Sequence, residues 1–149
     1  MILYLDMNVY YRVFDDQSQP GINNETKTIE LIFKIIEKWN YKLCWSYILE
    51  RENMANPSQD IKEDIKTIAS MSCSVYIQRD KKIEDIAGKI MENSNAKALD
   101  SLHLACAVYG NCDCFITCDD RFIKTINNNK EKLKDIIGSI KVINPLGFI

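Results

Sequence analysis

The sequence predicts an α/β fold with three layers, in which helices cover both faces of a central, mostly parallel sheet. Short apolar runs alternate along the chain with longer segments in which apolar residues recur at helical spacing. Strands that alternate with helices pair in parallel and are covered on both faces. Within the 149 residues we find no internal repeat and no linker rich in proline or glycine. We therefore expect a single domain over residues 1–149.

Five short runs predict the strands of this sheet. Each has the length of a buried strand and is followed by polar residues or by a helical pattern. The runs are ILYL (2–5), KLCW (42–45), SVYI (74–77), CFIT (114–117) and IKVI (140–143).

Helices are predicted between these runs, where apolar residues lie three or four positions apart. The predicted helices span 24–39, 46–56, 58–71, 81–93, 96–110 and a segment that starts at 119. In the first of them, Ile29, Ile32, Phe33 and Ile36 share one face. The segment 96–110 is the most apolar, so we expect it to be the most buried helix. The lysine-rich stretch 124–135 is expected to be a solvated face.

Composition limits the classes of protein that the chain can belong to. The net charge is −2 and the pI is about 5.5, so the chain lacks the basic surface of a general phosphate binder, and any contact with nucleic acid has to be local. The start of the chain lacks a signal-peptide pattern, and no apolar run approaches the length of a membrane span. We therefore expect a cytoplasmic protein that does not bind a membrane.

Six cysteines are expected to be reduced core residues in this compartment. They are Cys44, Cys73, Cys106, Cys112, Cys114 and Cys118. The run CDCFITC, at 112–118, does not have zinc-finger spacing, so we predict no zinc site there.

Carboxylates occur where the predicted strands end. Asp6 follows the first strand and Asp119 follows the fourth, while Asp100 lies near the start of the helix 96–110. In open α/β sheets, ligands bind beyond the carboxyl ends of the strands. An acid at a helix start is also a common cap, so any one of these residues alone is explained without a site.

Taken together, the acids predict a metal site. Two carboxylates about 4 Å apart repel by roughly 4 kcal/mol at an effective dielectric of about 20, and few basic residues adjoin these acids in the sequence. A hard divalent cation such as Mg2+ or Mn2+ prefers oxygen ligands of this kind. Such a centre suits phosphodiester hydrolysis, because the metal activates water and stabilises the leaving oxygen.

The order of these acids resembles that of the PIN-domain nucleases, which include VapC-type toxin ribonucleases. The first motif of that family is matched by LYLDMN, which supplies Asp6 and Asn8. The second is a glutamate six residues after a serine. Counting from Ser46 selects Glu52 rather than Glu50.

The later motifs of that family also have matches. LDSLHLA supplies Asp100 and Ser101, ITCDD supplies Thr117 and Asp119, and the closing VINPLGFI resembles the family's final strand and Asn-Pro turn. The resemblance covers essentially the whole chain and gives all four acids in order.

The resemblance implies a PIN-like fold and an endoribonuclease that depends on Mg2+ or Mn2+. Its catalytic residues and metal ligands would be Asp6, Glu52, Asp100 and Asp119, and its supporting polar residues would be Asn8, Ser101 and Thr117. It also implies RNA as the substrate. An antitoxin protein and a second copy of the chain are the partners that it suggests.

Other residues near these motifs have simpler explanations. His103 lies three residues after Asp100, on nearly the same helical face, and we expect a satisfied, partly buried histidine rather than a catalytic base. Tyr10, Tyr11 and Arg12 could contact RNA. Packing of a helix directly after the first strand, which would contain these three residues, is the better explanation.

Three other functions are weighed against the nuclease. A haloacid-dehalogenase-type phosphotransferase needs a second acid two residues after the first, where this chain has Asn8. A response-regulator receiver needs paired acids after the first strand, and these are missing. A PIN-like scaffold that binds RNA or protein without cutting is disfavoured because none of the four acidic positions is lost.

Overall fold

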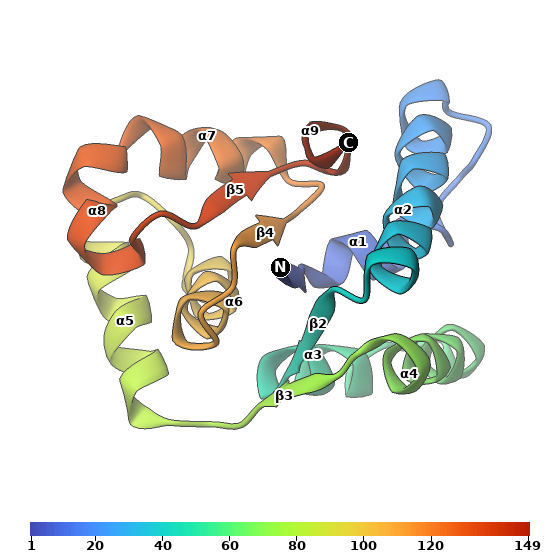
Figure 1. Ribbon diagram of the computed structural model, residues 1–149, viewed down its shortest axis with the longest axis horizontal. Coiled ribbons are helices and arrows are strands. Elements are labelled where there is room, and N and C mark those ends of the chain that lie inside the picture. The colour runs from blue at the N-terminus through green and yellow to red at the C-terminus, as the bar shows by residue number, and fades with distance from the viewer.

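The structure, a computed structural model that describes residues 1–149, contains one five-stranded sheet in which every neighbouring pair of strands is parallel (Figure 1). The strand order is β3-β2-β1-β4-β5. The strands are β1 (Ile2–Leu5), β2 (Lys42–Ser46), β3 (Val75–Ile77), β4 (Cys114–Ile116) and β5 (Lys141–Ile143). The predicted parallel sheet is confirmed, and each strand lies within two residues of its expected bounds.

Helices connect the strands and cover both faces of the sheet. Figure 1 shows α5 and α6 on one side and α2 and α4 on the other, which is the three-layer α/β/α arrangement that the sequence predicts. The helices are α1 (Met7–Arg12), α2 (Pro20–Trp39), α3 (Tyr47–Met54), α4 (Gln59–Ser72), α5 (Lys81–Glu92), α6 (Ala98–Tyr109), α7 (Asp120–Asn128), α8 (Lys130–Ile137) and α9 (Pro145–Phe148).

The central strand β1 is buried on both faces. Leu3, Tyr4 and Leu5 have no exposed surface, because β2 and β4 flank the strand and helices cover it above and below. This explains why β1 appears in the sequence as a continuous apolar run rather than as an alternating pattern. The position of β1 also places the residue that follows it, Asp6, in the middle of the carboxyl edge of the sheet.

Two helices differ from their expected form. Helix α2 begins at Pro20, four residues before the predicted start, because a proline in the first helical turn fixes the backbone for a helix without contributing to the apolar pattern. The stretch expected to be only a solvated face includes part of α8, whose Leu133 and Ile137 are buried. Its lysines occupy the other face of this amphipathic helix. The expected burial of α6 is confirmed, since six of its residues are buried.

All six cysteines are free thiols, five of them buried and Cys73 partly buried. None of the helices is both long enough and apolar enough to span a bilayer.

Candidate active site

Asp6 occupies the point where β1 ends and α1 begins. Its backbone N–H still donates to the carbonyl of Ile116 on β4 at 2.9 Å, so the residue is held by the sheet. Its side chain caps α1, because Oδ1 accepts from the backbone N–H of Met7 at 2.8 Å. The residue is only 5% exposed. A buried carboxylate is therefore fixed at the carboxyl edge of the sheet.

Asn8 and Thr117 hold the other oxygen of this carboxylate. The Thr117 hydroxyl donates to Asp6 Oδ2 at 2.9 Å, and Asn8 Nδ2 donates to the same oxygen at 3.2 Å. Asn8 Nδ2 also donates to Thr117 Oγ1 at 2.9 Å, while Asn8 Oδ1 accepts from the backbone N–H of Cys118 at 2.9 Å. These bonds connect the end of β1 to the end of β4. Both residues lie where a support for Asp6 is expected.

Glu52, and not Glu50, lies beside Asp6. Helix α3 starts after Ser46, whose hydroxyl accepts from the backbone N–H of Leu49 at 3.2 Å. From that start, Glu52 turns toward α6 and hydrogen-bonds to His103 Nε2. The same nitrogen is 3.8 Å from Asp6 Oδ1. Glu50 turns elsewhere and accepts from Trp45 Nε1 at 2.7 Å, as expected for two helical residues whose side chains diverge by about 200°.

Asp100 and Asp119 approach from two further elements. Asp100 lies in the first turn of α6 and is partly buried. Asp119 is the N-cap of α7, where its Oδ1 accepts from the backbone N–H of Phe122 at 3.1 Å. Asp120 lies in the first turn of that helix and is exposed. Asp119 therefore uses one oxygen as a helix cap, and its second oxygen makes no hydrogen bond.

The acids affect one another's pKa. Burial raises the pKa of the Asp100 carboxyl group, and the charges of Asp6 and Asp119 raise it further. Burial also raises the pKa of Asp6, and Glu52 adds to this increase, whereas His103 and the hydrogen bonds from Thr117 and Met7 oppose it. The carboxylates are close enough to repel one another, and His103 opposes the rise in the pKa of both Asp6 and Asp100.

His103 is enclosed by a chain of hydrogen bonds that the sequence did not reveal. Its Nδ1 is 2.8 Å from the hydroxyl of Tyr4, which is in turn 2.6 Å from Ser46 Oγ. The expectation of a satisfied histidine is confirmed, although the residue is fully rather than partly buried, at 1% exposure. Tyr4 was missed because it lies inside an apolar run. A tyrosine in a central strand needs a partner for its hydroxyl, and that requirement is the signal.

Ser101 is not connected to the acids. It has no exposed surface, and its hydroxyl makes no hydrogen bond. The structure thus brings Asn8 and Thr117 to Asp6, but it gives the third expected support residue no contact with a carboxylate.

Tyr10 is buried against Trp45, with their rings edge to face at 5.4 Å. Arg12 forms ion pairs with Asp15 and Glu25. Packing, as expected, explains Tyr10.

The donor chemistry of the four acids fits a hard divalent cation. Asp6, Glu52, Asp100 and Asp119 supply carboxylate oxygens, and none of the four forms an ion pair with lysine or arginine. In the structure as it stands, no three His, Cys, Asp or Glu side chains are close enough together to hold a metal ion. The acids share one edge of the sheet, but Glu52 is turned onto His103.

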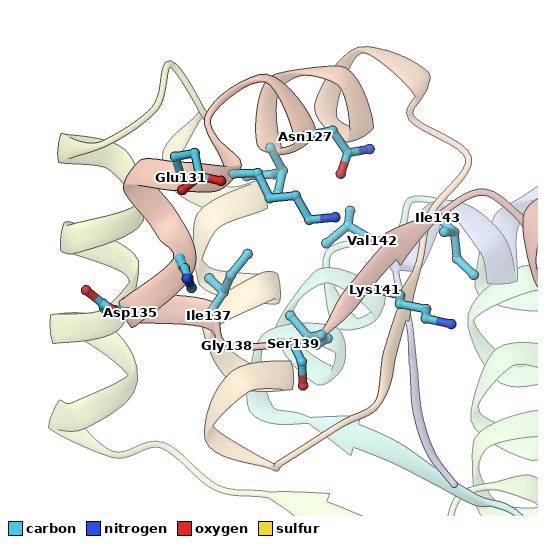
Figure 2. A pocket seen from close by; sticks show the side chains of 13 residues that line it. Asn127, Glu131, Asp135, Ile137, Gly138, Ser139, Lys141, Val142 and Ile143 are labelled. Carbon is cyan, nitrogen blue, oxygen red and sulfur yellow. The ribbon is translucent and has the colours of Figure 1, made fainter.

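A large cavity lies away from these acids. It has a volume of about 910 Å³ and lies between α7, α8 and β5. Figure 2 shows Ile137 and Val142 in its wall and Lys141 near its edge. None of the four acids lines it.

A comparison with family models supports the reading of the motifs. The model described as PIN domain matches residues 3–127 of the chain. This range includes all four acids. It also includes Asn8 and Thr117, the two residues whose side chains donate to Asp6. A search of the curated proteins found no match.

Proposed function

The chain belongs to the PIN-domain family, and on that premise we propose that it is an endoribonuclease that depends on Mg2+ or Mn2+ and hydrolyses RNA at its acidic edge. PIN domains are generally metal-dependent nucleases, so a hydrolase that acts on nucleic acid is the coarse statement that the family supports. The proposal adds the substrate, the metal and the residues Asp6, Glu52, Asp100 and Asp119.

The single observation that carries the proposal is the state of Asp6. A buried carboxylate is costly unless it is compensated. Asp6 receives hydrogen bonds from Met7, Asn8 and Thr117, yet it also lies among other carboxylates without a lysine or arginine partner. Its one basic neighbour, His103, whose Nε2 is 3.8 Å from Asp6 Oδ1, is hydrogen-bonded to Glu52 through that same nitrogen. The arrangement is what a bound cation requires.

Each residue has a role that follows from its contacts. Thr117 and Asn8 fix the orientation of the Asp6 carboxylate. His103 holds Glu52 through one ring nitrogen and is itself fixed through the other by Tyr4. Asp119 keeps one oxygen free while its other oxygen caps α7. A divalent cation held by these acids would supply an activated water and a stabilised leaving oxygen.

Few basic groups that could bind RNA lie near the acidic edge. Lys97, at the N-cap of α6, is close enough to Asp100 to oppose slightly the rise in that residue's pKa. The acids are otherwise without basic partners, so a bound cation would also reduce repulsion of the phosphates. We therefore expect the metal to be required for RNA binding as well as for RNA cleavage.

A second candidate function is an RNA-binding scaffold that does not cut. It is favoured by one observation, namely that the acids are not gathered closely enough to hold a metal ion as the structure stands. The phosphotransferase alternative has no such support. Its second acid would have to stand at position 8, where the Asn8 amide instead hydrogen-bonds to Asp6, Thr117 and Cys118.

The test is cleavage of a mixed RNA pool with and without EDTA, with Mn2+ or Mg2+ added back. We expect cleavage to stop in EDTA and to return with either metal. Asp120→Asn is the matched control for the acids, since that residue is exposed in the neighbouring position. RNA that is bound but uncut by the unmodified protein with Mn2+ would establish the scaffold instead. Cleavage that EDTA does not reduce would refute the metal mechanism.

The toxin role is a further part of this proposal. A toxin of this type would be inhibited by a cognate antitoxin, and it would act on RNA in the cytoplasm, alone or as a homodimer. The observation that tests it is a gene for a small DNA-binding protein directly upstream. Co-expression of that protein is expected to abolish cleavage and to relieve growth arrest.

A further inference from the structure

Two cysteines from distant parts of the chain touch each other beneath the sheet. Cys44 lies on β2, and Cys112 lies in the turn between α6 and β4, 68 residues away. Their sulfur atoms are 3.5 Å apart. Strand β1 lies between β2 and β4 in the sheet, so this contact joins elements on either side of the central strand.

No other pair of thiols in the chain makes such a contact. Cys73 uses its thiol to donate to the carbonyl of Cys44 at 3.8 Å. Cys106, Cys114 and Cys118 form no sulfur–sulfur contact. A disulfide needs its sulfur atoms about 2.0 Å apart, so the sulfurs of Cys44 and Cys112 have to approach by roughly 1.5 Å.

Cys112 lies in a tight turn outside the strands. The preceding residue, Asn111, has φ of 55°, which is the left-handed conformation typical of a tight turn. Cys112 itself is 7% exposed, whereas Cys44 has no exposed surface. Of the two residues, Cys112 is therefore the nearer to solvent. A small rotation of the Cys112 side chain changes no strand pairing, because β4 begins only at Cys114.

We propose that Cys44 and Cys112 are a site of reversible oxidation, at which hydrogen peroxide converts the two thiols into an intramolecular disulfide. One thiol loses its proton and, as the thiolate, attacks a peroxide oxygen; an S–O bond forms, the O–O bond breaks, and the released hydroxide combines with that proton to give water. The second sulfur then attacks the resulting sulfenic acid, forming the S–S bond and releasing the oxygen as a second water. Two thiols and one peroxide thus give one disulfide and two waters.

The disulfide stabilises the fold and leaves the acids untouched. It closes a long loop and so restricts the unfolded chain, an effect that corresponds to a rise in melting temperature of roughly 5 to 15 °C for a protein of this size. Cys112 precedes β4, so it lies at the edge of the sheet opposite the acids, which follow the strands. The proposal does not depend on the proposed nuclease activity.

The experiment compares the intact mass and melting temperature of the purified protein before and after peroxide treatment. We expect the loss of two hydrogen atoms, a linked pair of peptides containing Cys44 and Cys112, a higher melting temperature, and full reversal by dithiothreitol. Cys44→Ala and Cys112→Ala should each abolish all four effects. Cys114→Ala is the matched control, since it removes a buried thiol two residues away, and it should retain them.

Two results would overturn the proposal. One is oxidised protein that gains oxygen atoms without a peptide crosslink. The other is a crosslink that persists in Cys112→Ala. If an alanine variant does not fold, peptide mapping of the unmodified protein decides the question, because a crosslink that joins any other pair contradicts the assignment.

Discussion

The two sides of the acidic edge are built differently. Asp6 extends from the central strand, is almost fully buried, and receives three hydrogen bonds from Met7, Asn8 and Thr117. Glu52 extends from helix α3, its side chain is 28% exposed, and its hydrogen-bond partner is His103. The strand-borne acid is fixed before any ligand arrives, whereas the helix-borne acid depends on one contact. A site assembled in this way has a rigid half and an adjustable half.

The largest effect should come from the rigid half. We expect Asp6→Asn to reduce RNA cleavage by more than about 100-fold, since loss of the partners of a metal ligand alone costs roughly 10- to 100-fold. Unfolding without metal should be unchanged or require a higher temperature, because repulsion among the acids is relieved. Cleavage rates and thermal unfolding measure the two effects. A large loss of stability with retained cleavage would show that Asp6 is a structural residue. The distinction between a rigid and an adjustable half of the site would then be wrong.

Removing the support of Asp6 should have the next largest effect. Thr117→Val keeps the shape of the side chain but deletes the hydroxyl that donates to Asp6 and accepts from Asn8. We expect Mn2+ affinity and cleavage to fall by about 10- to 100-fold, and stability to fall by roughly 1 to 3 kcal/mol. Thr125→Val is the control, because that hydroxyl only bonds to a carbonyl within α7. Equal behaviour of the two variants would show that the rigidity of Asp6 is unimportant.

The adjustable half is tested by its two glutamates. Glu52→Gln should lower cleavage by about 10-fold, since an amide is a poor ligand but still bonds to His103. Glu50→Gln should leave cleavage unchanged, because Glu50 bonds to Trp45 on another face of α3. The same cleavage assay compares both. A larger defect from Glu50→Gln would contradict the assignment of Glu52 and with it the two-part view of the site.

The smallest effects should come from the two aspartates at α7. Asp119→Asn should weaken Mn2+ binding with little loss of stability, because asparagine is an equally good N-cap. Asp120→Asn should leave Mn2+ binding intact and cost about 0.3 to 1 kcal/mol, the usual contribution of an acid in the first helical turn. Calorimetric titration of Mn2+ separates the two. Normal affinity in Asp119→Asn with weakened affinity in Asp120→Asn would reverse these roles.

The fold was largely predictable because its three central strands, β1, β2 and β4, are buried on both faces. An apolar run such as ILYL at 2–5 marks a central parallel strand directly, and the predicted strand and β1 coincide. The start of α2 was predicted too late because Pro20 begins the helix without an apolar signal. Helix α8 was not predicted separately, because lysines dominate its composition while only Leu133 and Ile137 are buried in it.

The site was predictable only in part. The position of Asp6 follows from the rule that sites form beyond the carboxyl ends of strands. The choice of Glu52 rested on counting from Ser46, which the structure shows to be the last residue of β2. The contact between His103 and Glu52 spans 51 residues, and that between Tyr4 and His103 spans 99. No local pattern encodes contacts of that length, so the hydrogen-bond chain had to be found in the structure.

The hydrogen bond from Thr117 to Asp6 also determines at which stage of translation the acidic edge can form. The two residues are 111 positions apart, so a ribosome completes the first strand long before it makes the residue that orients the first acid. The central strand cannot finish pairing until β4 has emerged, because its backbone at Asp6 bonds to Ile116. The nascent chain therefore carries Asp6 without Thr117 through most of translation. The acidic edge assembles only when nearly the whole chain is available to fold.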